Sequence, residues 1–345
     1  MELRSAFPAV RASSRLWGKG QSQVHVLGDF GKMSEDARDA ATADLGFLRP
    51  LPAWAHRKRT WAPDLLAGVV WRCLANLGTH RRVVQLLKLP LLAEAARDNP
   101  RFAYKYLTHD YLVRGLTTAE RASSFLHHYR RMHAALPDRT LREILHELLK
   151  IHETDADGNR FTITMGLSRD FDKEGEFSLN LHVNGEIVHL LCFTVAPGEI
   201  VGSEAAEVLL ISRNQGMKGS YELIRRATRA LHDVSPGALL FASLQGIAIA
   251  FGIRQIAGIC AARQSSFTEA SAVDFRQAYD DFFAGMGIPQ TSGGFFLATV
   301  PVEARPLAII KKGHKLRTKQ KRAFKQQIQS ASTDFFTRRM SDFNG

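Results

Sequence analysis

The chain has 345 residues, of which 45% are hydrophobic and 23% are charged. This composition is ordinary for a soluble globular protein and excludes wholesale disorder, a collagen-like chain and a coiled-coil rod. Three scattered cysteines without a CxxC pair exclude a disulfide framework and a cysteine-rich zinc site, and they suit a reducing compartment. The net charge of +12 and the pI near 9.8 predict attraction to an anionic partner, such as nucleic acid, a phosphorylated cofactor or a lipid surface.

Residues 1–60 mix proline, glycine, serine and charge without sustained periodicity. This pattern predicts a flexible leader, with helical character around Glu35–Asp44. The basic first residues lack the apolar core of about 7 to 15 residues that a secretory signal contains, so we expect no such signal.

Residues 61–157 show a helical pattern. Thr117 and Glu120 form a capping box, which predicts that a helix begins there. The pair Pro137-Asp138 interrupts the pattern, and Thr140–Lys150 predicts a further helix.

After Gly158 the hydrophobic pattern changes from helical to alternating, and Phe161–Leu167 predicts a strand. Glu176–Val183 and Glu186–Val195 predict a hairpin, because the Asn-Gly pair between them accepts the positive φ of a type I′ turn. The expected register pairs residue 183 with 186, 181 with 188 and 180 with 189. Four polar residues then share one face of the hairpin: Ser178, Asn180, His182 and His189.

Strands and helices alternate in the next region. The predicted strands are Glu207–Ser212, Leu239–Leu244, Gln255–Cys260 and Phe295–Val300. The predicted helices are Ser220–His232 and Asp274–Gly285. An antiparallel meander followed by this alternation predicts an α+β fold, a mixed β-sheet flanked by helices and preceded by a helical N-terminal region. The expected divisions are a flexible leader (1–60), a helical region packing on the core (61–157), the sheet core (158–305) and a basic C-terminal tail (306–345).

The apolar stretch Gly237–Ala262 has nearly the length of a membrane span. It contains Ser243, Arg254, two glutamines and several glycines, which are costly at the centre of a bilayer. We therefore interpret it as protein core and expect a cytoplasmic protein that is at most peripheral to the inner membrane.

The basic charge is concentrated in Lys311–Lys325, which holds eight Lys or Arg residues and no acid. The other 330 residues carry about +4. One interpretation is a solvated basic helix, and another is a surface that binds RNA phosphates or anionic lipid headgroups. The residues concerned are Lys311, Lys312, Lys315, Arg317, Lys319, Lys321, Arg322 and Lys325.

A glycine-containing loop joins the predicted strand at 207–212 to the helix that follows it. Such a loop presents unpaired backbone N–H groups to an anion, and Arg213 and Lys218 add positive charge. Arg213, Gly216 and Gly219 resemble the acyl-CoA pyrophosphate loop of the GNAT acyltransferases, with one extra residue between the glycines. This resemblance implies a GNAT-like core with an acyl-CoA or aminoacyl donor at these residues, and an ordinary glycine turn is the alternative.

A second resemblance covers residues 85 to 330. The motifs that carry it are Leu126-His127-His128-Tyr129, Gly175-Glu176-Phe177-Ser178-Leu179, Leu244-Gln245-Gly246, Ala278-Tyr279-Asp280-Asp281-Phe282-Phe283 and His314-Lys315-Leu316-Arg317-Thr318-Lys319. In this order they resemble the VirK/YbjX family of bacterial proteins, with Phe282-Phe283 where Phe-Trp is expected. The resemblance implies a role in virulence, envelope stress and antimicrobial-peptide resistance, without implying a reaction.

The hairpin offers candidate catalytic groups. His182 or His189 would take a proton from an attacking amine, and Glu176 would orient the histidine. The alternative is a solvated sheet face. The GNAT resemblance adds Tyr279 as an acid for the leaving group, and no motif indicates a metal site.

Two functions follow from these observations. The first is an acyl- or aminoacyl-transferase with a phosphorylated donor and an amine-bearing acceptor. The second is a non-enzymatic post-transcriptional regulator that binds RNA or an anionic membrane through the basic tail. Strands that separate beside Gly216 would favour the transferase, because in GNAT-like folds such a separation admits the donor. The sequence does not specify an oligomeric state.

Overall fold

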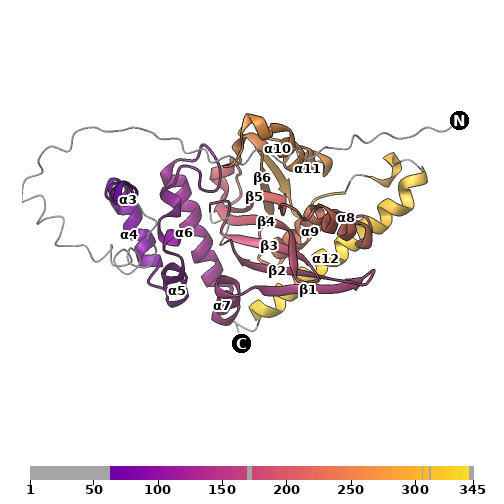
Figure 1. Cartoon of the computed structure of the whole chain (residues 1–345), viewed down its shortest axis with the longest axis horizontal. Coiled ribbons are helices and arrows are strands. Elements are labelled where there is room, and N and C mark those ends of the chain that lie inside the picture. The colour runs from indigo at the N-terminus through magenta and orange to yellow at the C-terminus, as the bar shows by residue number, and fades with distance from the viewer. Residues whose placement is uncertain (1–62, 169–172, 305, 311, 342–345) are drawn as a thin grey trace, which may run out of the picture. The chain divides into compact units, whose positions relative to one another are not determined.

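The computed structural model describes residues 63–168, 173–304, 306–310 and 312–341 (Figure 1). The predicted leader and its helical stretch at Glu35–Asp44 lie outside these residues. The described part has the expected α+β architecture, with an open sheet of seven strands flanked by helices.

The sheet follows chain order from β1 to β7. Its strands are β1 (Leu149–Ala156), β2 (Asn159–Leu167), β3 (Phe177–Val183), β4 (Glu186–Pro197), β5 (Glu207–Gly216), β6 (Gln255–Ile259) and β7 (Phe295–Thr299). The first five strands form an antiparallel meander, β6 is parallel to β5, and β7 is antiparallel to β6. The mixed sheet predicted from the alternating pattern is therefore confirmed.

Helices precede the sheet and connect its later strands. The earlier helices are α3 (Pro63–Ala75), α4 (Leu77–Leu86), α5 (Pro90–Asp98), α6 (Thr118–Ala135) and α7 (Asp138–His146), with the 3-10 turns η2 (Pro100–Ala103) and η3 (Lys105–Leu107). The later helices are α8 (Tyr221–Ala230), α9 (Pro236–Ala250), α10 (Ala272–Ala278), α11 (Asp280–Gly285) and α12 (Lys315–Ser341). Short 3-10 turns complete the connections: η4 (Gly198–Val201), η5 (Ala261–Arg263), η6 (Glu269–Ser271), η7 (Leu307–Ile309) and η8 (Lys312–His314).

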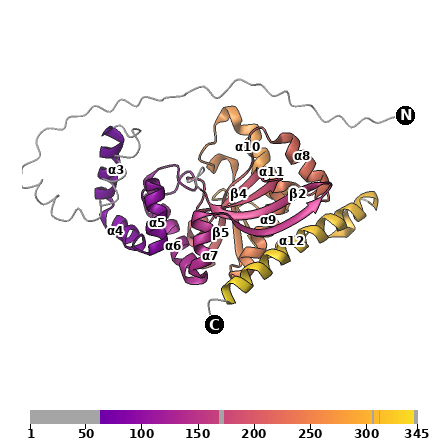
Figure 2. The same ribbon diagram turned by 60° about the horizontal axis from the view of Figure 1, so that its bottom comes forward.

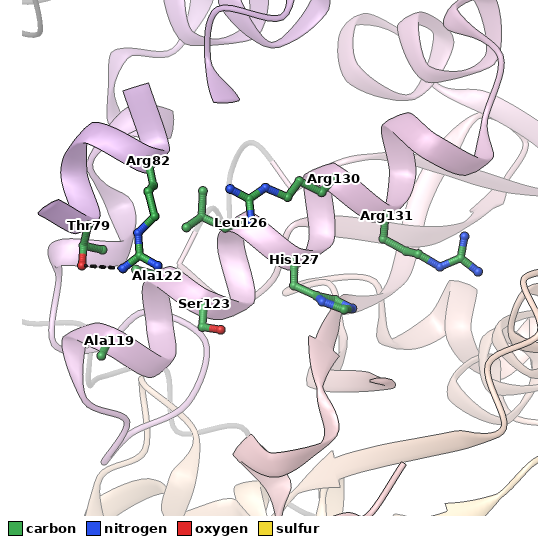
Figure 3. Close-up of a pocket in the computed structure, with 9 residues that line it drawn as sticks. All are labelled: Thr79, Arg82, Ala119, Ala122, Ser123, Leu126, His127, Arg130 and Arg131. Atoms are coloured by element: carbon green, nitrogen blue, oxygen red, sulfur yellow. Dashed lines mark hydrogen bonds between the residues drawn. The ribbon is translucent and has the colours of Figure 1, made fainter. Parts of the chain in front are cut away.

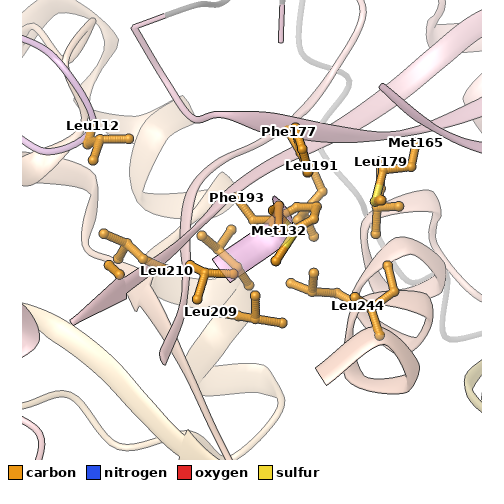
Figure 4. Close-up of a cluster of buried hydrophobic side chains, with 14 of the residues drawn as sticks. Leu112, Met132, Met165, Phe177, Leu179, Leu191, Phe193, Leu209, Leu210 and Leu244 are labelled. Atoms are coloured by element: carbon orange, nitrogen blue, oxygen red, sulfur yellow. The ribbon is translucent and has the colours of Figure 1, made fainter. Parts of the chain in front are cut away.

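Helices from both halves of the chain bury the sheet. The α6 helix begins at the predicted capping box and packs on β4, while α7 packs on β2. The α9 helix packs across β3 to β6, and α12 runs along α9 (Figures 1 and 2). Side chains from α6, α9 and the central strands meet in one apolar cluster that includes Met132, Leu244 and Phe193 (Figure 4).

The predicted strand at Leu239–Leu244 is wrong, because these residues lie inside α9. This helix is apolar on almost every side, since it packs against the sheet and also against α12, so its sequence shows no helical period. The Oγ atoms of Ser243 and Ser332 lie 2.8 Å apart between the two helices. A Cβ at Gly246 would lie 2.2 Å from the Gln329 carbonyl oxygen. In the described part of the chain, no helix is both long and apolar enough to cross a membrane.

Two other helix predictions need correction. The helix expected at Thr140–Lys150 ends at His146, and the chain is extended again from Leu149 as β1. The sequence conceals β1 because its outer residues are polar and only its first positions turn inward. The helix expected at Asp274–Gly285 is divided at Tyr279 into α10 and α11.

The Asn184-Gly185 turn is confirmed, and both residues have positive φ. Val183 pairs with Glu186 as predicted, but a bulge follows between Leu181 and His182. The rest of the predicted register is therefore wrong, because Leu181 lies opposite His189. Directly opposite residues share a face, so His189 lies on the Leu181 face and not on the face of Asn180 and His182.

Candidate functional site

The parallel strands β5 and β6 are paired over a short distance only. They pair at only three positions, from Leu209–Ile256 to Ile211–Gly258. The β5 strand continues to Gly216, whereas β6 ends at Ile259. Ser212 is an extra residue in β5, since Cys192 lies opposite Arg213 and Phe193 lies opposite Ile211. After Ile211, β5 is therefore paired with β4 alone, and β6 ends one residue after its last pair with β5.

The predicted loop after β5 is shorter than expected. Arg213 and Gly216 lie within the strand, and only residues 217–220 connect it to α8. Lys218 and Gly219 are exposed there, and Gly219 has a φ of 86°. Ser220 makes no side-chain cap to α8 within the described structure. The loop therefore brings Lys218, Gly219 and the N–H groups of the first helical turn together, as an anion site requires.

A buried polar cluster lies beside Arg213. The Glu174 carboxylate forms an ion pair with the Arg213 guanidinium and accepts a hydrogen bond from the Gln264 amide. Ser266 donates to the same carboxylate at 3.1 Å. Arg213 therefore has a buried carboxylate partner, and its main contact is internal, which the sequence did not suggest. We call Glu174, Arg213, Gln264 and Ser266 the Glu174 cluster.

Tyr279 lies close to this cluster and is fully buried. Burial raises its pKa well above the usual range, and the Glu174 charge adds to this effect, while the charge of Arg213 opposes it. The phenol is therefore protonated at neutral pH. Cys192 accepts a hydrogen bond from Ser168 at 3.1 Å, and burial raises the pKa of its thiol to about 12.

His189 lies beside the last residues of β5. Its Nε2 is 2.9 Å from the Asn214 Oδ1, so Nε2 carries the proton and Nδ1 keeps a lone pair when the amide oxygen is the acceptor. Burial lowers the pKa of His189 to about 4 against the raising effect of the Asn214 hydrogen bond, and the charge of Arg213 lowers it further. A Cβ at Gly237 would lie 3.2 Å from Nε2, so the start of α9 approaches closely only because a glycine is there. His189 is therefore a neutral, oriented imidazole.

His182 has a different environment. Its Nε2 lies 2.9 Å from the Thr164 Oγ1, and its Nδ1 lies 3.3 Å from the Gly185 carbonyl oxygen. Both ring nitrogens are occupied, and burial lowers its pKa. The polar face that carries His182 is buried, with Ser178 and Asn180, and is not a solvated surface.

Glu176 contacts neither candidate histidine in the described structure. Its carboxylate lies 2.5 Å from the Lys105 Nζ and accepts hydrogen bonds from the Tyr111 and Tyr129 hydroxyls. The Lys105 ammonium also lies 5.1 Å from the centre of the Phe102 ring. We call Glu176, Lys105, Tyr111 and Tyr129 the Glu176 cluster. A lysine between tyrosines in Tyr104-Lys105-Tyr106 was the available signal for this missed residue.

The basic residues of the tail lie mostly in the first half of α12. Lys315, Arg317 and Lys319 are exposed, and Arg317 pairs with Asp233 at 2.7 Å. Arg322 is partly buried. Burial lowers the pKa of Lys321 and of Lys325, and neighbouring positive charges lower both further. Lys311 lies outside the described residues, as does the side chain of Lys312.

Comparison with known proteins gives one match. A family model described as "Protein of unknown function (DUF535)" matches residues 67–332, which is well over half of the chain and extends from α3 into α12. No curated protein and no solved structure matches the chain.

Proposed function

The chain belongs to the DUF535 family of proteins of unknown function, and we propose that it transfers an acyl or aminoacyl group from a phosphorylated donor to an amine. DUF535 is the family of the VirK/YbjX proteins, which the sequence motifs resemble. The biological setting that we propose is therefore theirs: virulence, envelope stress and antimicrobial-peptide resistance in a bacterium. We also propose a cytoplasmic location, at most peripheral to the inner membrane.

The early end of the pairing between β5 and β6 carries this proposal. Pairing stops at Ile211 and Gly258, and the rest of β5 leads directly into the glycine loop before α8. In GNAT-like folds, two parallel strands separate at the corresponding place to admit the donor. An antiparallel meander, one parallel strand and a final antiparallel strand are also arranged as that resemblance implies.

The donor's phosphates would bind at residues 217–220, where the N-terminus of α8, Lys218 and Gly219 come together. In this proposal Arg213 acts indirectly. Its ion pair with Glu174 holds the end of β5 against the loops that follow β2 and β6. Gly216 lies close to α8, since a Cβ there would lie 2.6 Å from the Ile224 Cδ1 and would have to displace it.

His189 is the proposed proton acceptor. The amine nitrogen attacks the donor carbonyl carbon, and a C–N bond forms while the bond from that carbon to the leaving sulfur or oxygen breaks. The Nδ1 of His189 takes the proton from the attacking nitrogen, and the Tyr279 hydroxyl gives a proton to the leaving atom. Because its pKa is about 4, His189 is unprotonated at neutral pH, and its Nδ1 has a lone pair that can accept a proton.

Donor binding is tested by thermal unfolding with a panel of acyl-CoA thioesters and aminoacyl-tRNAs. A donor at one hundred times its Kd should raise the Tm by roughly 5 °C. Gly216→Asp should abolish this shift, because the side chain must displace Ile224 and adds negative charge to the loop. Gly285→Asp, at an exposed glycine with nothing within 4 Å of its Cβ position, is the matched control. The absence of a shift for every donor in the parent chain would refute donor binding.

Catalysis is tested by comparing the two histidines with the donor that binds. His189→Gln should lower kcat about a hundredfold or more while leaving KM for the donor nearly unchanged. His182→Gln should lower kcat much less, because both nitrogens of His182 are already hydrogen-bonded. Equal losses in the two variants would contradict the assignment of His189.

A second candidate function rests on the exposed basic face of α12. There Lys315 and Lys319 are solvent-exposed beside the more buried Lys321 and Lys325. A regulator of this kind would bind RNA or anionic vesicles with an affinity that falls steeply with salt. Lys315→Gln combined with Lys319→Gln should reduce the slope of log K against log salt concentration by about one unit for each phosphate contact that is lost. Unchanged binding in that double variant would exclude this surface.

A further inference from the structure

A pocket of about 420 Å³ lies between α4 and α6 (Figure 3). Thr79 and Arg82, one turn apart on α4, form one wall. The other wall is formed by α6, where lining residues recur every four positions and therefore share one face of the helix. Along this face Ala122 and Leu126 are small or apolar, and Arg130 follows them. None of its lining residues belongs to the segment from Arg213 to Gly219.

Part of the positive charge of this pocket is balanced within the protein. Glu207, the first residue of β5, accepts from Arg131 Nε at 3.0 Å and lies 2.9 Å from the His127 Nε2. Arg131 also donates to the Phe251 carbonyl oxygen at 2.6 Å. Both side chains are therefore fixed by contacts outside the pocket, and Figure 3 shows Arg131 directed away from Arg82.

Arg82 and Arg130 are not balanced in this way. Within the described residues neither has an ion-pair partner, and the one side-chain hydrogen bond of Arg82 goes to Thr79 Oγ1 at 3.4 Å. Figure 3 shows Arg130 turned back along α6 toward Arg82, with Leu126 between the two. Two guanidinium groups that line one pocket can each donate a pair of hydrogen bonds to the oxygens of one phosphoryl group.

We propose that this pocket binds a small phosphorylated molecule, with its phosphoryl group held between Arg82 and Arg130. The Ser123 hydroxyl offers a further donor, and the surfaces of Ala122 and Leu126 receive the less polar part of the ligand. A volume of about 420 Å³ suits a compact molecule or a lipid headgroup and not a nucleic-acid strand. The site is independent of the proposed acyl transfer, because it shares no residue with the β5–α8 loop.

The full chain is titrated with glycerol 3-phosphate, and separately with phosphatidylcholine vesicles that contain phosphatidic acid, which presents the same phosphomonoester. Saturable binding of one phosphoryl group per chain is expected. Arg82→Gln and Arg130→Gln should each weaken it at least tenfold, because each removes a charged double donor. Arg81→Gln is the matched control, since Arg81 is an exposed arginine of the same helix that does not line the pocket, and it should weaken binding less than twofold.

The two titrations identify the source of the phosphoryl group. Binding to glycerol 3-phosphate that requires both arginines indicates a soluble ligand, and vesicle binding alone with the same requirement indicates a lipid headgroup. Ser123→Glu places a carboxylate in the pocket and should abolish either form of binding. A circular dichroism spectrum like that of the parent chain shows that the variant has lost binding and not its fold. The proposal is overturned if neither probe binds, or if Arg81→Gln weakens binding as much as Arg82→Gln and Arg130→Gln.

Discussion

Glu174 and Glu176 stand two residues apart at the entry to β3, and both are buried, yet their clusters differ in kind. The Glu176 cluster joins the sheet to the helical region through Lys105, which is enclosed by aromatic rings. The Glu174 cluster joins the end of β5 to the chain after β6 through Arg213 and uncharged polar side chains.

The Glu176 cluster has a structural role, whereas the Glu174 cluster lies at the candidate site. The Glu176 carboxylate is shared by an ammonium and two phenols with no exposed member, so its role is to hold α6 and η3 to the sheet. The Glu174 cluster lies where the pairing between β5 and β6 ends, close to the protonated Tyr279, and its Arg213 side chain keeps 13% of its surface exposed. A site that must admit a ligand needs polar groups that solvent can reach, and of the two clusters the Glu174 cluster has the partly exposed charged side chain.

The largest expected effect comes from breaking the Glu176 cluster. Glu176→Gln keeps the shape and one acceptor oxygen for the tyrosine hydroxyls, but it leaves the Lys105 ammonium buried without a counter-charge. The free energy of unfolding should fall by about 3–5 kcal/mol, as it does when one partner of a buried pair is removed. Urea denaturation followed by circular dichroism measures this loss.

The control for that variant removes both charges. Lys105→Met combined with Glu176→Gln should recover most of the lost free energy, because an uncharged pair has no uncompensated buried ion. If the single variant loses less than about 1 kcal/mol, or the double variant is no more stable than the single one, the ion pair does not hold these elements together.

A smaller loss is expected from the Glu174 cluster. Glu174→Gln removes the carboxylate that Arg213 and Gln264 share, and Arg213 is partly exposed to water. The free energy of unfolding should fall by about 2 kcal/mol, within the range of hydrogen bonds to charged groups. Ser266→Ala, which removes a single 3.1 Å donor, is the control and should lose about 1 kcal/mol or less. A loss for Glu174→Gln as large as that for Glu176→Gln would erase the distinction between the clusters.

The sequence predicted those elements whose signals are local. The start of α6 at the Thr117 capping box and the hairpin turn at Asn184-Gly185 were both predicted correctly. Each depends only on residues that are close together in the sequence. The bulge beside His182 and the buried helix α9 were not predictable in this way, since each depends on what packs against it. A single bulge moved His189 to the other face and so separated it from His182.

The candidate site was predicted in part for the same reason. Gly216 and His189 were found from strand and loop patterns, and the structure places them near each other, with a Cβ at Gly216 3.7 Å from the His189 Nδ1. Glu174 and Lys105 were missed because their partners lie far along the chain, Arg213 for the first and Glu176 for the second. Ion pairs of this kind have no spacing that one sequence can reveal.

The last comparison of the two clusters is a dependence on pH, which for one histidine and one pH unit is smaller than the loss expected for either glutamate variant. It concerns one histidine beside each cluster. Burial lowers the pKa of His128, and the charge of Lys105 lowers it further, while His189 next to Arg213 has a pKa of about 4. Both lie below the unfolded value of about 6.5, so the unfolded chain binds the extra protons. Stability is therefore lost as pH falls below about 6.5, by up to about 1.4 kcal/mol per pH unit for each histidine. His189→Gln and His128→Asn each retain one hydrogen-bonding group. Each should reduce the dependence of the unfolding free energy on pH by the contribution of up to one bound proton, as measured by urea denaturation at a series of pH values. An unchanged slope in His128→Asn together with a flattened one in His189→Gln would mean that only the histidine beside the Glu174 cluster is protonated when the chain unfolds in acid.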